Sequence, residues 1–316
     1  MSADELAYVA LVSRDAGRAA HFLERTLGLA RTDVPVASTS RTVPIFAVGR
    51  SAVALFAPGD PFLGGDDRSG VHHLAFSAPD PEQRGAGLQS AGIPPLRGDA
   101  GQGLQNRKRV ALDPAVTAGV RAYLTEPLEL HPSPPGKVQR LDHIGIASAD
   151  NRAAIDIFCG KLGLVLESQQ TDMEVEIAVE SFTSDKYGAV YHTRPPRPAG
   201  GLRVAFITAG DCELEFLQNF DAAQGSFVDH AVAGTTRQDQ GAITRYIANR
   251  GAGLHHVALK VNDIDAVLAD VGRDGFVTID KVGRPGSRRA LIGFVQPKSL
   301  GSILIHFVQR DELART

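Results

Sequence analysis

Four side chains that commonly bind metals lie in the second half of the sequence, each within a short apolar segment. They are His143 in LDHIGI, Glu215 in ELEFLQ, His256 in LHHVAL and His306 in LIHFVQ. Alternate residues of a β-strand face the same side, so strands around one cavity can each direct one donor towards a common point. Imidazoles with one carboxylate suit zinc, iron, nickel, cobalt or manganese better than calcium or magnesium. The residue types therefore predict one divalent-metal site.

An internal repeat relates the two halves of the sequence. GVHHLAFSAPD returns as GLHHVALKVND, and LAYVALVS returns as LDHIGIAS. The spacing is also kept, because 50 residues separate His73 from Tyr123 and 50 separate His256 from His306. A repeat of this kind indicates two copies of one structural unit.

The first copy carries a different set of residues at the positions of the four donors. We align them with Tyr8, Leu55, His73 and Tyr123. A single histidine at a strand end is usually a hydrogen-bonded structural residue, and we interpret His73 in this way. The metal is therefore expected in the second copy only. His255 should face the side opposite His256 and either pack or support its neighbour.

The elements that must position these residues follow from the hydrophobic pattern. In the second copy, DHIGIAS, EVEIAVES, RVAFITA and CELEFLQ are predicted strands that accompany a helix in NRAAIDIFCGKLG. HHVALKV, ALIGFVQ and SILIHFVQ are predicted strands that accompany a helix in IDAVLADVGRDG. The pattern predicts an α+β fold of four βαβββ modules, paired into two domains with curved mixed sheets.

The domain boundaries are predicted from one segment rich in proline. HPSPPGKVQ contains three prolines and a glycine, which disfavour regular structure. We expect a metal-free first domain at residues 1–130, a linker at 131–140 and a metal-bearing domain at 141–316. Insertions in the second copy, TSDKYGAVYHTRPPRPAGG and the stretch 219–249, are expected to cover its cavity.

Composition excludes several classes of function. The 316 residues carry a formal charge of −3 and are 43% hydrophobic and 22% charged, which is typical of a soluble globular protein without a basic surface for nucleic acid. No apolar run is long enough for a membrane span or a secretory signal. Cys159 and Cys212 form no CxxC motif, so we expect neither disulfides nor thiolate zinc, and a cytoplasmic location. The partner is expected to be a small molecule, and a homodimer is left open.

Four segments carry a family resemblance. LDHIGIAS, CELEFLQ, GAGLHHVALKVNDIDAVL and QPKSLGSILIHFVQ resemble the vicinal oxygen chelate superfamily of glyoxalases, bleomycin-resistance proteins and dioxygenases, and are most similar to methylmalonyl-CoA epimerase. The resemblance covers nearly all of residues 141–309, and the first half only in degenerate form. It implies metal ligands at His143, Glu215, His256 and His306. The last departs from the family, which normally has a carboxylate there.

The resemblance also implies a type of reaction. It points to an epimerase, isomerase or lyase that binds two neighbouring substrate oxygens and moves a proton next to a carbonyl through a metal-bound enolate. In MEVEIAVE, the acids Glu174, Glu176 and Glu180 share one face of a predicted strand. Glu176 best matches a catalytic acid of some bacterial epimerases, with Tyr191 and His192 as weaker candidates. The alternative for these acids is a solvated edge strand.

Two other functions remain open. The two-half arrangement and the segment FVQR resemble non-haem iron dioxygenases of the extradiol and 4-hydroxyphenylpyruvate types. Those enzymes use two histidines and one carboxylate, with nothing from the position of Glu215. The third function is a non-catalytic ligand-binding or resistance protein, although such proteins typically lack the metal set. The loop GRPGSRRA could bind an anion through Arg284, Arg288 and Arg289, or could simply be solvated.

Overall fold

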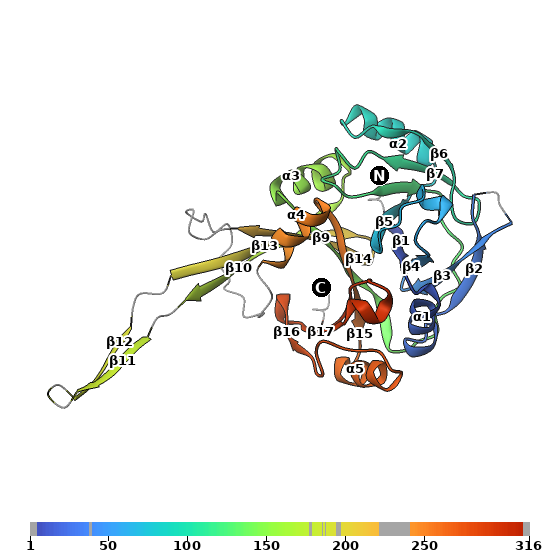
Figure 1. The fold of residues 1–316 in the computed structure, drawn as a ribbon. Coiled ribbons are helices and arrows are strands. Elements are labelled where there is room, and N and C mark those ends of the chain that lie inside the picture. The colour runs from blue at the N-terminus through green and yellow to red at the C-terminus, as the bar shows by residue number, and fades with distance from the viewer. Residues whose placement is uncertain are drawn as a thin grey trace.

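A computed structural model gives the architecture of the chain (Figure 1). It describes residues 5–37, 40–176, 179–184, 186, 188–193, 197–220 and 241–311. For residues 97–100, 173–176, 179–184, 189–193 and 197–200 it describes the backbone only.

The first half of the chain forms an eight-stranded mixed sheet with the order β2-β3-β4-β1-β5-β8-β7-β6. Its strands are β1 (Glu5–Val12), β2 (Arg31–Pro35), β3 (Thr42–Val48), β4 (Ser51–Phe56), β5 (Gly70–Ser77), β6 (Pro95–Gln102), β7 (Lys108–Leu112) and β8 (Ala122–Thr125). Its helices are α1 (Ala16–His21), the π-helix η1 (Phe22–Thr26), the short 3₁₀ helix η2 (Pro61–Leu63) and α2 (Pro81–Ser90).

The second half repeats this sheet, strand for strand, in the order β10-β13-β14-β9-β15-β18-β17-β16. Its strands are β9 (Val138–Ala147), β10 (Val165–Glu176), β13 (Arg197–Ala209), β14 (Cys212–Phe220), β15 (Gly253–Val261), β16 (Arg284–Pro285), β17 (Leu291–Val295) and β18 (Ile305–Gln309). Its helices are α3 (Asn151–Ile155), the π-helix η3 (Asp156–Lys161), α4 (Ala242–Arg250), α5 (Ile264–Arg273), and the 3₁₀ helices η5 (Ser287–Arg289) and η6 (Pro297–Leu300).

Each half is built from two βαβββ modules joined along their first strands. In the first half, β1 is parallel to β4 and antiparallel to β5, which in turn is parallel to β8. In the second half, β9, β14, β15 and β18 have the same relations. The predicted α+β class with curved mixed sheets is confirmed. In each half, the four central strands surround one common point.

The two sheets pack into one body. Phe22 of η1 lies against Phe276 and Phe307 of the second half, with ring centroids 5.0 and 6.5 Å apart. Arg18 of α1 donates hydrogen bonds to the carbonyl oxygens of Ser299 and Gly275, and buried side chains of both halves form a continuous core. The first sheet ends at residue 125 and the second begins at residue 138. The predicted division into domains at 131–140 stays a prediction.

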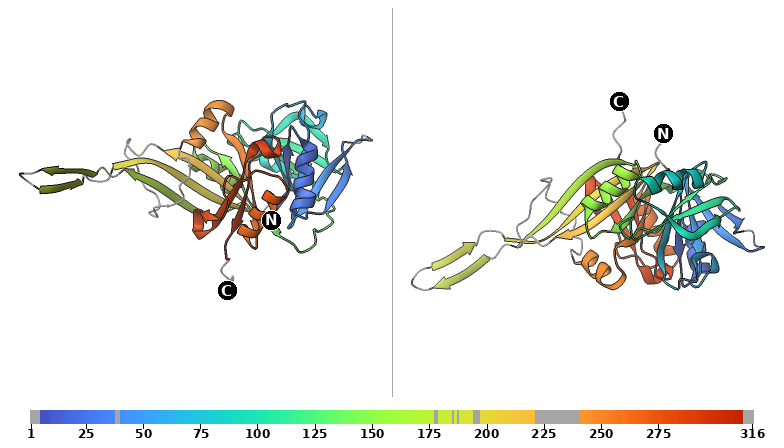
Figure 2. Two further views of the ribbon diagram at one scale, coloured as in Figure 1. Left: turned by 60° about the horizontal axis from the view of Figure 1, so that its bottom comes forward. Right: turned by 90° about the horizontal axis from the view of Figure 1, so that it is seen from above.

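The insertions of the second half differ from each other. Strands β11 (Val179–Ser184) and β12 (Gly188–Thr193) form a separate two-stranded hairpin that projects away from the body (Figure 2). This hairpin does not cover the cavity in the way we expected from the sequence. Helix α4, which the sequence analysis did not identify, packs its Ile243 with Leu217 and Phe206 of the sheet. No helix in the described parts of the chain has the length and apolar character needed to cross a membrane.

Candidate metal centre

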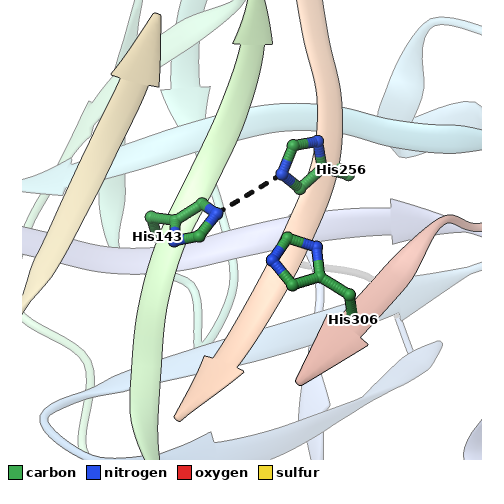
Figure 3. Close-up of side chains that lie close together, drawn as sticks. All are labelled: His143, His256 and His306. Carbon is green, nitrogen blue, oxygen red and sulfur yellow. Dashed lines mark hydrogen bonds between the residues drawn. The ribbon is translucent and has the colours of Figure 1, made fainter. Parts of the chain in front are cut away.

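Four side chains converge at the centre of the second sheet. His143 of β9, Glu215 of β14, His256 of β15 and His306 of β18 come from four adjacent strands and are all buried. One ring nitrogen of each histidine lies within 4.8 Å of a ring nitrogen of both other histidines (Figure 3). Oε2 of Glu215 lies 3.2 Å from Nε2 of His143 and 3.5 Å from Nε2 of His256. The structure thus brings together all four residues predicted as metal ligands.

Neighbouring side chains orient the rings. Nδ1 of His143 forms a 2.8 Å hydrogen bond with Oδ1 of the buried Asp142. A 2.9 Å hydrogen bond joins Nδ1 of His256 to Nδ1 of His255, so His255 contacts its neighbour as a supporting residue. These bonds leave the two Nε2 atoms facing each other across 3.4 Å. A hydrogen bond on the far nitrogen of a histidine is the usual way in which proteins orient metal-binding imidazoles.

Gly145 makes room for this arrangement, and the sequence analysis did not identify it. In β9, Gly145 is paired with Glu215 on one side and with His256 on the other. A Cβ atom at position 145 would lie 2.0 Å from Cε1 of His256, which is a severe overlap. The available signal was a glycine inside a predicted strand, which often marks a close approach.

The charges of the cluster are mutually dependent. Burial lowers the pKa of His143, but the carboxylates of Glu215 and Asp142 outweigh it and raise that pKa to about 9. Burial raises the pKa of Glu215, but the neighbouring His143 and His256 hold it well below its usual range. Burial, and to a smaller extent the nearby imidazoles, lower the pKa of His306 well below its usual range. The cluster is thus one buried carboxylate facing three imidazoles.

This donor set fits a divalent metal. Nδ1 of His306 is buried and has no hydrogen-bond partner within the described residues. Buried polar atoms are nearly always paired, so hydrogen bonds within the described residues do not satisfy this group of imidazoles completely. A dication bound by these residues would satisfy the imidazole nitrogens and the Glu215 carboxylate together.

A small cavity of about 50 Å³ opens beside the cluster. Phe206, Ile292 and Phe294 give it an apolar wall, and Arg288 covers it. The guanidinium carbon of Arg288 lies 3.5 Å from the centroid of the Phe206 ring. The space is suited to the reactive end of a small substrate, rather than to a whole large one.

The arginines of the GRPGSRRA loop have different surroundings. Nη1 and Nη2 of Arg288 pair with Glu167 and Glu213 at 3.0 and 2.5 Å. Its Nε is buried and makes no hydrogen bond within the described part of the chain. Arg284 pairs with Asp280, and Arg289 is exposed. Of these three loop arginines, Arg288 alone lines the cavity, and its role in binding an anion stays a prediction.

The predicted proton carrier lies only partly within the described structure. The backbone of Glu176 ends β10 opposite Arg197, but its side chain and those of Tyr191 and His192 lie outside the described residues. Asp172, on the same strand, was not identified from the sequence although it alternates with Glu174 and Glu176.

Asp172 is a buried carboxyl group with spare acceptor capacity. It is 1% exposed, and one oxygen accepts a 2.6 Å hydrogen bond from Nε2 of Gln170. The other oxygen is buried without a hydrogen-bond partner among the described residues. Burial, together with the charge of Glu215, raises the pKa of Asp172. A buried acid whose pKa is raised in part by the carboxylate of the candidate metal site is a candidate for proton transfer.

The first sheet corrects one of our predicted equivalences. Gly145 is paired with Glu215, and the matching residue Ala10 is paired with Ala54 rather than Leu55. The residues at the four central positions of the first half are therefore Tyr8, Ala54, His73 and Tyr123. Leu55 was wrong by one residue, and its side chain belongs to the core on the opposite face.

A family model and a known protein are each similar to about half of this chain. Residues 142–294 match the family model of the Glyoxalase/Bleomycin resistance protein/Dioxygenase superfamily. The mitochondrial methylmalonyl-CoA epimerase of Mus musculus is 23% identical over 177 residues, which cover 56% of this chain and 76% of that protein. The predicted superfamily resemblance is confirmed.

Two solved structures resemble the fold over nearly the whole chain. A mutant of 4-hydroxymandelate synthase from Streptomyces coelicolor has a TM-score of 0.61 and 15% identity, and covers 100% of this chain and 95% of its own. The 2,3-dioxygenase LapB from Pseudomonas sp. KL28 has a TM-score of 0.57 and 14% identity, with 99% and 94% covered. At these identities the likeness shows a shared two-sheet fold.

Proposed function

Because residues 142–294 match the glyoxalase, bleomycin resistance and dioxygenase superfamily, we propose that this chain is a divalent-metal-dependent enzyme of that superfamily. Its reaction is a proton transfer next to a carbonyl group, as in an epimerase or isomerase, or in a lyase that starts with the same step. The observation that carries this proposal is the convergence of His143, Glu215, His256 and His306 on one buried point.

These four residues would hold the metal. When bound, a divalent cation supplies positive charge that stabilises negative charge developing on a substrate oxygen. Asp142 and His255 keep the ligand rings in place, and the apolar wall of the cavity excludes water, which strengthens charge interactions inside it. The unpaired Nε–H of Arg288 would donate a hydrogen bond to a substrate carboxylate or carbonyl oxygen.

The proton is moved by an acid on β10. Glu176 remains the residue that the family resemblance favours. Asp172 is the acid whose burial and free oxygen are described, and the same strand presents both. Removing one acid–base group lowers rates by about 100- to 10,000-fold, so the two carboxyl groups can be separated by single substitutions.

The second candidate is a non-haem iron dioxygenase, which the whole-chain fold likeness to the 2,3-dioxygenase LapB favours. His143 and His256 would supply the two histidines that such enzymes use, but the carboxylate of this chain is Glu215, at a position from which those enzymes take no ligand. His306 argues against this candidate. With four protein donors around it, a bound metal would have less room to take up a chelating substrate and dioxygen together.

Metal analysis and isotope exchange test the proposal. Protein purified without chelator should contain one divalent metal per chain by elemental analysis. With methylmalonyl-CoA as the first substrate tested, because of the epimerase relatives, the enzyme should introduce solvent deuterium at the carbon next to the carbonyl without consuming oxygen. Of the variants Glu176→Gln and Asp172→Asn, the one that removes the proton carrier should abolish exchange but keep the metal. Absence of metal would refute the proposal, and oxygen uptake matched to product would establish the dioxygenase instead.

A further inference from the structure

A second cavity, of about 250 Å³, lies between the two halves and shares no residue with the metal pocket. The first half contributes the segment before β5, the start of β5 and the loop before β8. The second half contributes the end of α4 and the start of β15. The cavity therefore depends on the way in which both halves meet.

Positive charge is concentrated in this cavity. Arg68 and Arg121 from the first half and Arg250 from the second half line it, and Asp66 is the only acid among its lining residues. Burial, followed by the charge of Arg121, lowers the pKa of His72 to about 4, so that this histidine is neutral at pH 7. The lining residues thus carry a net charge of about +2, which is three guanidinium groups against one carboxylate.

The contacts within the cavity hold the arginines but do not use all their donors. The Asp66 carboxylate accepts from Nε and Nη2 of Arg68 and from Nη1 of Arg121. Nη1 of Arg250 donates to the carbonyl oxygen of Ser69 at 3.0 Å. Within the described residues, no hydrogen bond is made by Nη1 of Arg68 or by Nη2 of Arg121, whereas the Arg250 guanidinium also interacts with the Tyr246 hydroxyl group. Donors therefore remain for an external oxyanion.

A buried hydroxyl group gives an independent sign of a missing partner. Ser69 lines the cavity and is 3% exposed, yet its Oγ has no hydrogen-bond partner in the described part of the chain. Buried hydroxyl groups are rarely left unpaired. An oxyanion placed among the three guanidinium groups would accept from this hydroxyl as well.

The backbones of the two halves touch at one wall of the cavity. A Cβ atom at Gly119 would lie 2.3 Å from the carbonyl oxygen of Ala252, so the two backbones meet directly at this point. Gly119 has a φ of +81°, a conformation that favours glycine. This contact fixes the loop that precedes Arg121 relative to the residues that follow Arg250.

We propose that this cavity binds a dianionic phosphate group, either inorganic phosphate or the phosphate end of a small molecule. The fork of an arginine matches phosphate oxygens in geometry, and a phosphate carries about −1.5 to −2 charges at neutral pH, close to the excess positive charge of the cavity. A bound phosphate would contact both halves and stabilise their association. The site is independent of the proposed metal chemistry.

Calorimetric titration at low ionic strength tests this assignment, with inorganic phosphate, glycerol phosphate and acetate as probes. Phosphate should bind and acetate should bind at least about tenfold more weakly, because acetate offers one charge and fewer acceptors. Loss of a charge-assisted hydrogen bond should weaken phosphate binding in Arg250→Gln and in Arg121→Gln by about tenfold or more. Glycerol phosphate distinguishes a phosphomonoester from the free ion as the preferred form.

Two control variants make the test specific. Arg245→Gln removes the same charge from helix α4 but lies outside the cavity lining, and should bind phosphate as the wild type does. His256→Ala, which should lose the metal, should also keep phosphate binding, so failure of the metal proposal leaves this one intact. Equal weakening in Arg245→Gln and Arg250→Gln, loss in His256→Ala, acetate binding as tight as phosphate, or no phosphate binding to the wild type would each overturn the proposal.

Discussion

The two halves of the chain share one strand order but surround their central positions with different side chains. In the second half, three histidines and a glutamate meet at the centre. In the first half, the hydroxyl group of Tyr8 lies 3.2 Å from Nε2 of His73, and Tyr123 packs against the same imidazole with ring centroids 4.7 Å apart. Burial raises the pKa of Tyr8, so its phenol stays protonated and is a poor metal ligand.

The first half also fills the space that the second half leaves open. The short helix η2 carries Phe62, whose ring stacks on Phe56 at 5.4 Å and lies 6.4 Å from His73. Arg109 covers Phe62 at 4.1 Å. The supporting residues differ too, because Ala7 and Ala10 stand where the second half has Asp142 and Gly145. The shared topology provides four converging strands, and a few side chains decide whether these strands present a set of possible metal donors.

The sharpest test of this contrast compares the two equivalent histidines. His256→Ala should remove a ligand and lower metal affinity by more than the roughly 100-fold typical of supporting residues, so the purified protein should be essentially free of metal. His73→Ala should leave the metal content unchanged, although it creates a cavity and lowers stability. Elemental analysis of both variants, with circular dichroism to establish folding, gives the answer. Metal lost from His73→Ala but kept by His256→Ala would reverse the assignment.

A second test concerns His306, the proposed ligand that departs from the family pattern. His306→Ala should weaken metal binding strongly, because the cluster loses one of its four donors. His306→Glu should retain a site, since the family normally has a carboxylate at this position. Competition titration with a chromogenic chelator measures both affinities. If His306→Ala binds metal as tightly as the wild type, His306 is not a ligand.

Much of this difference between the halves could be predicted from the sequence, because the two copies of the repeat keep the same spacing. The matching positions of His73 and His256, and of Tyr123 and His306, appear in the same strand pairs of the two sheets. The position of Leu55 was wrong for a physical reason. Every residue of SAVALF in β4 is buried, so no alternation of polar and apolar residues fixes which side chains face the cavity.

Other features depend on contacts that a sequence pattern does not contain. The strand pattern of the sequence did not show that the β11–β12 hairpin projects away from the rest of the molecule (Figure 1). The cavity between the halves combines arginines that are more than a hundred residues apart, such as Arg121 and Arg250. Asp172 precedes the acidic run that drew attention to Glu176, and its burial became visible only in the folded sheet.

The smallest substitution that should affect the two halves differently adds one methyl group. Gly145→Ala places a Cβ atom 2.0 Å from the His256 ring, so that either the ring or strand β9 must move. Overpacking of this kind usually costs about 1–3 kcal/mol of stability, and displacement of a ligand should weaken metal binding by a comparable free energy, about tenfold or more. The matched change in the first half is Ala10→Gly, which should lower stability by about 0.5–1 kcal/mol through backbone entropy and leave metal affinity unchanged. Urea unfolding and metal titration of both variants measure the two effects. Unchanged metal affinity in Gly145→Ala would show that the glycine is not needed to place His256.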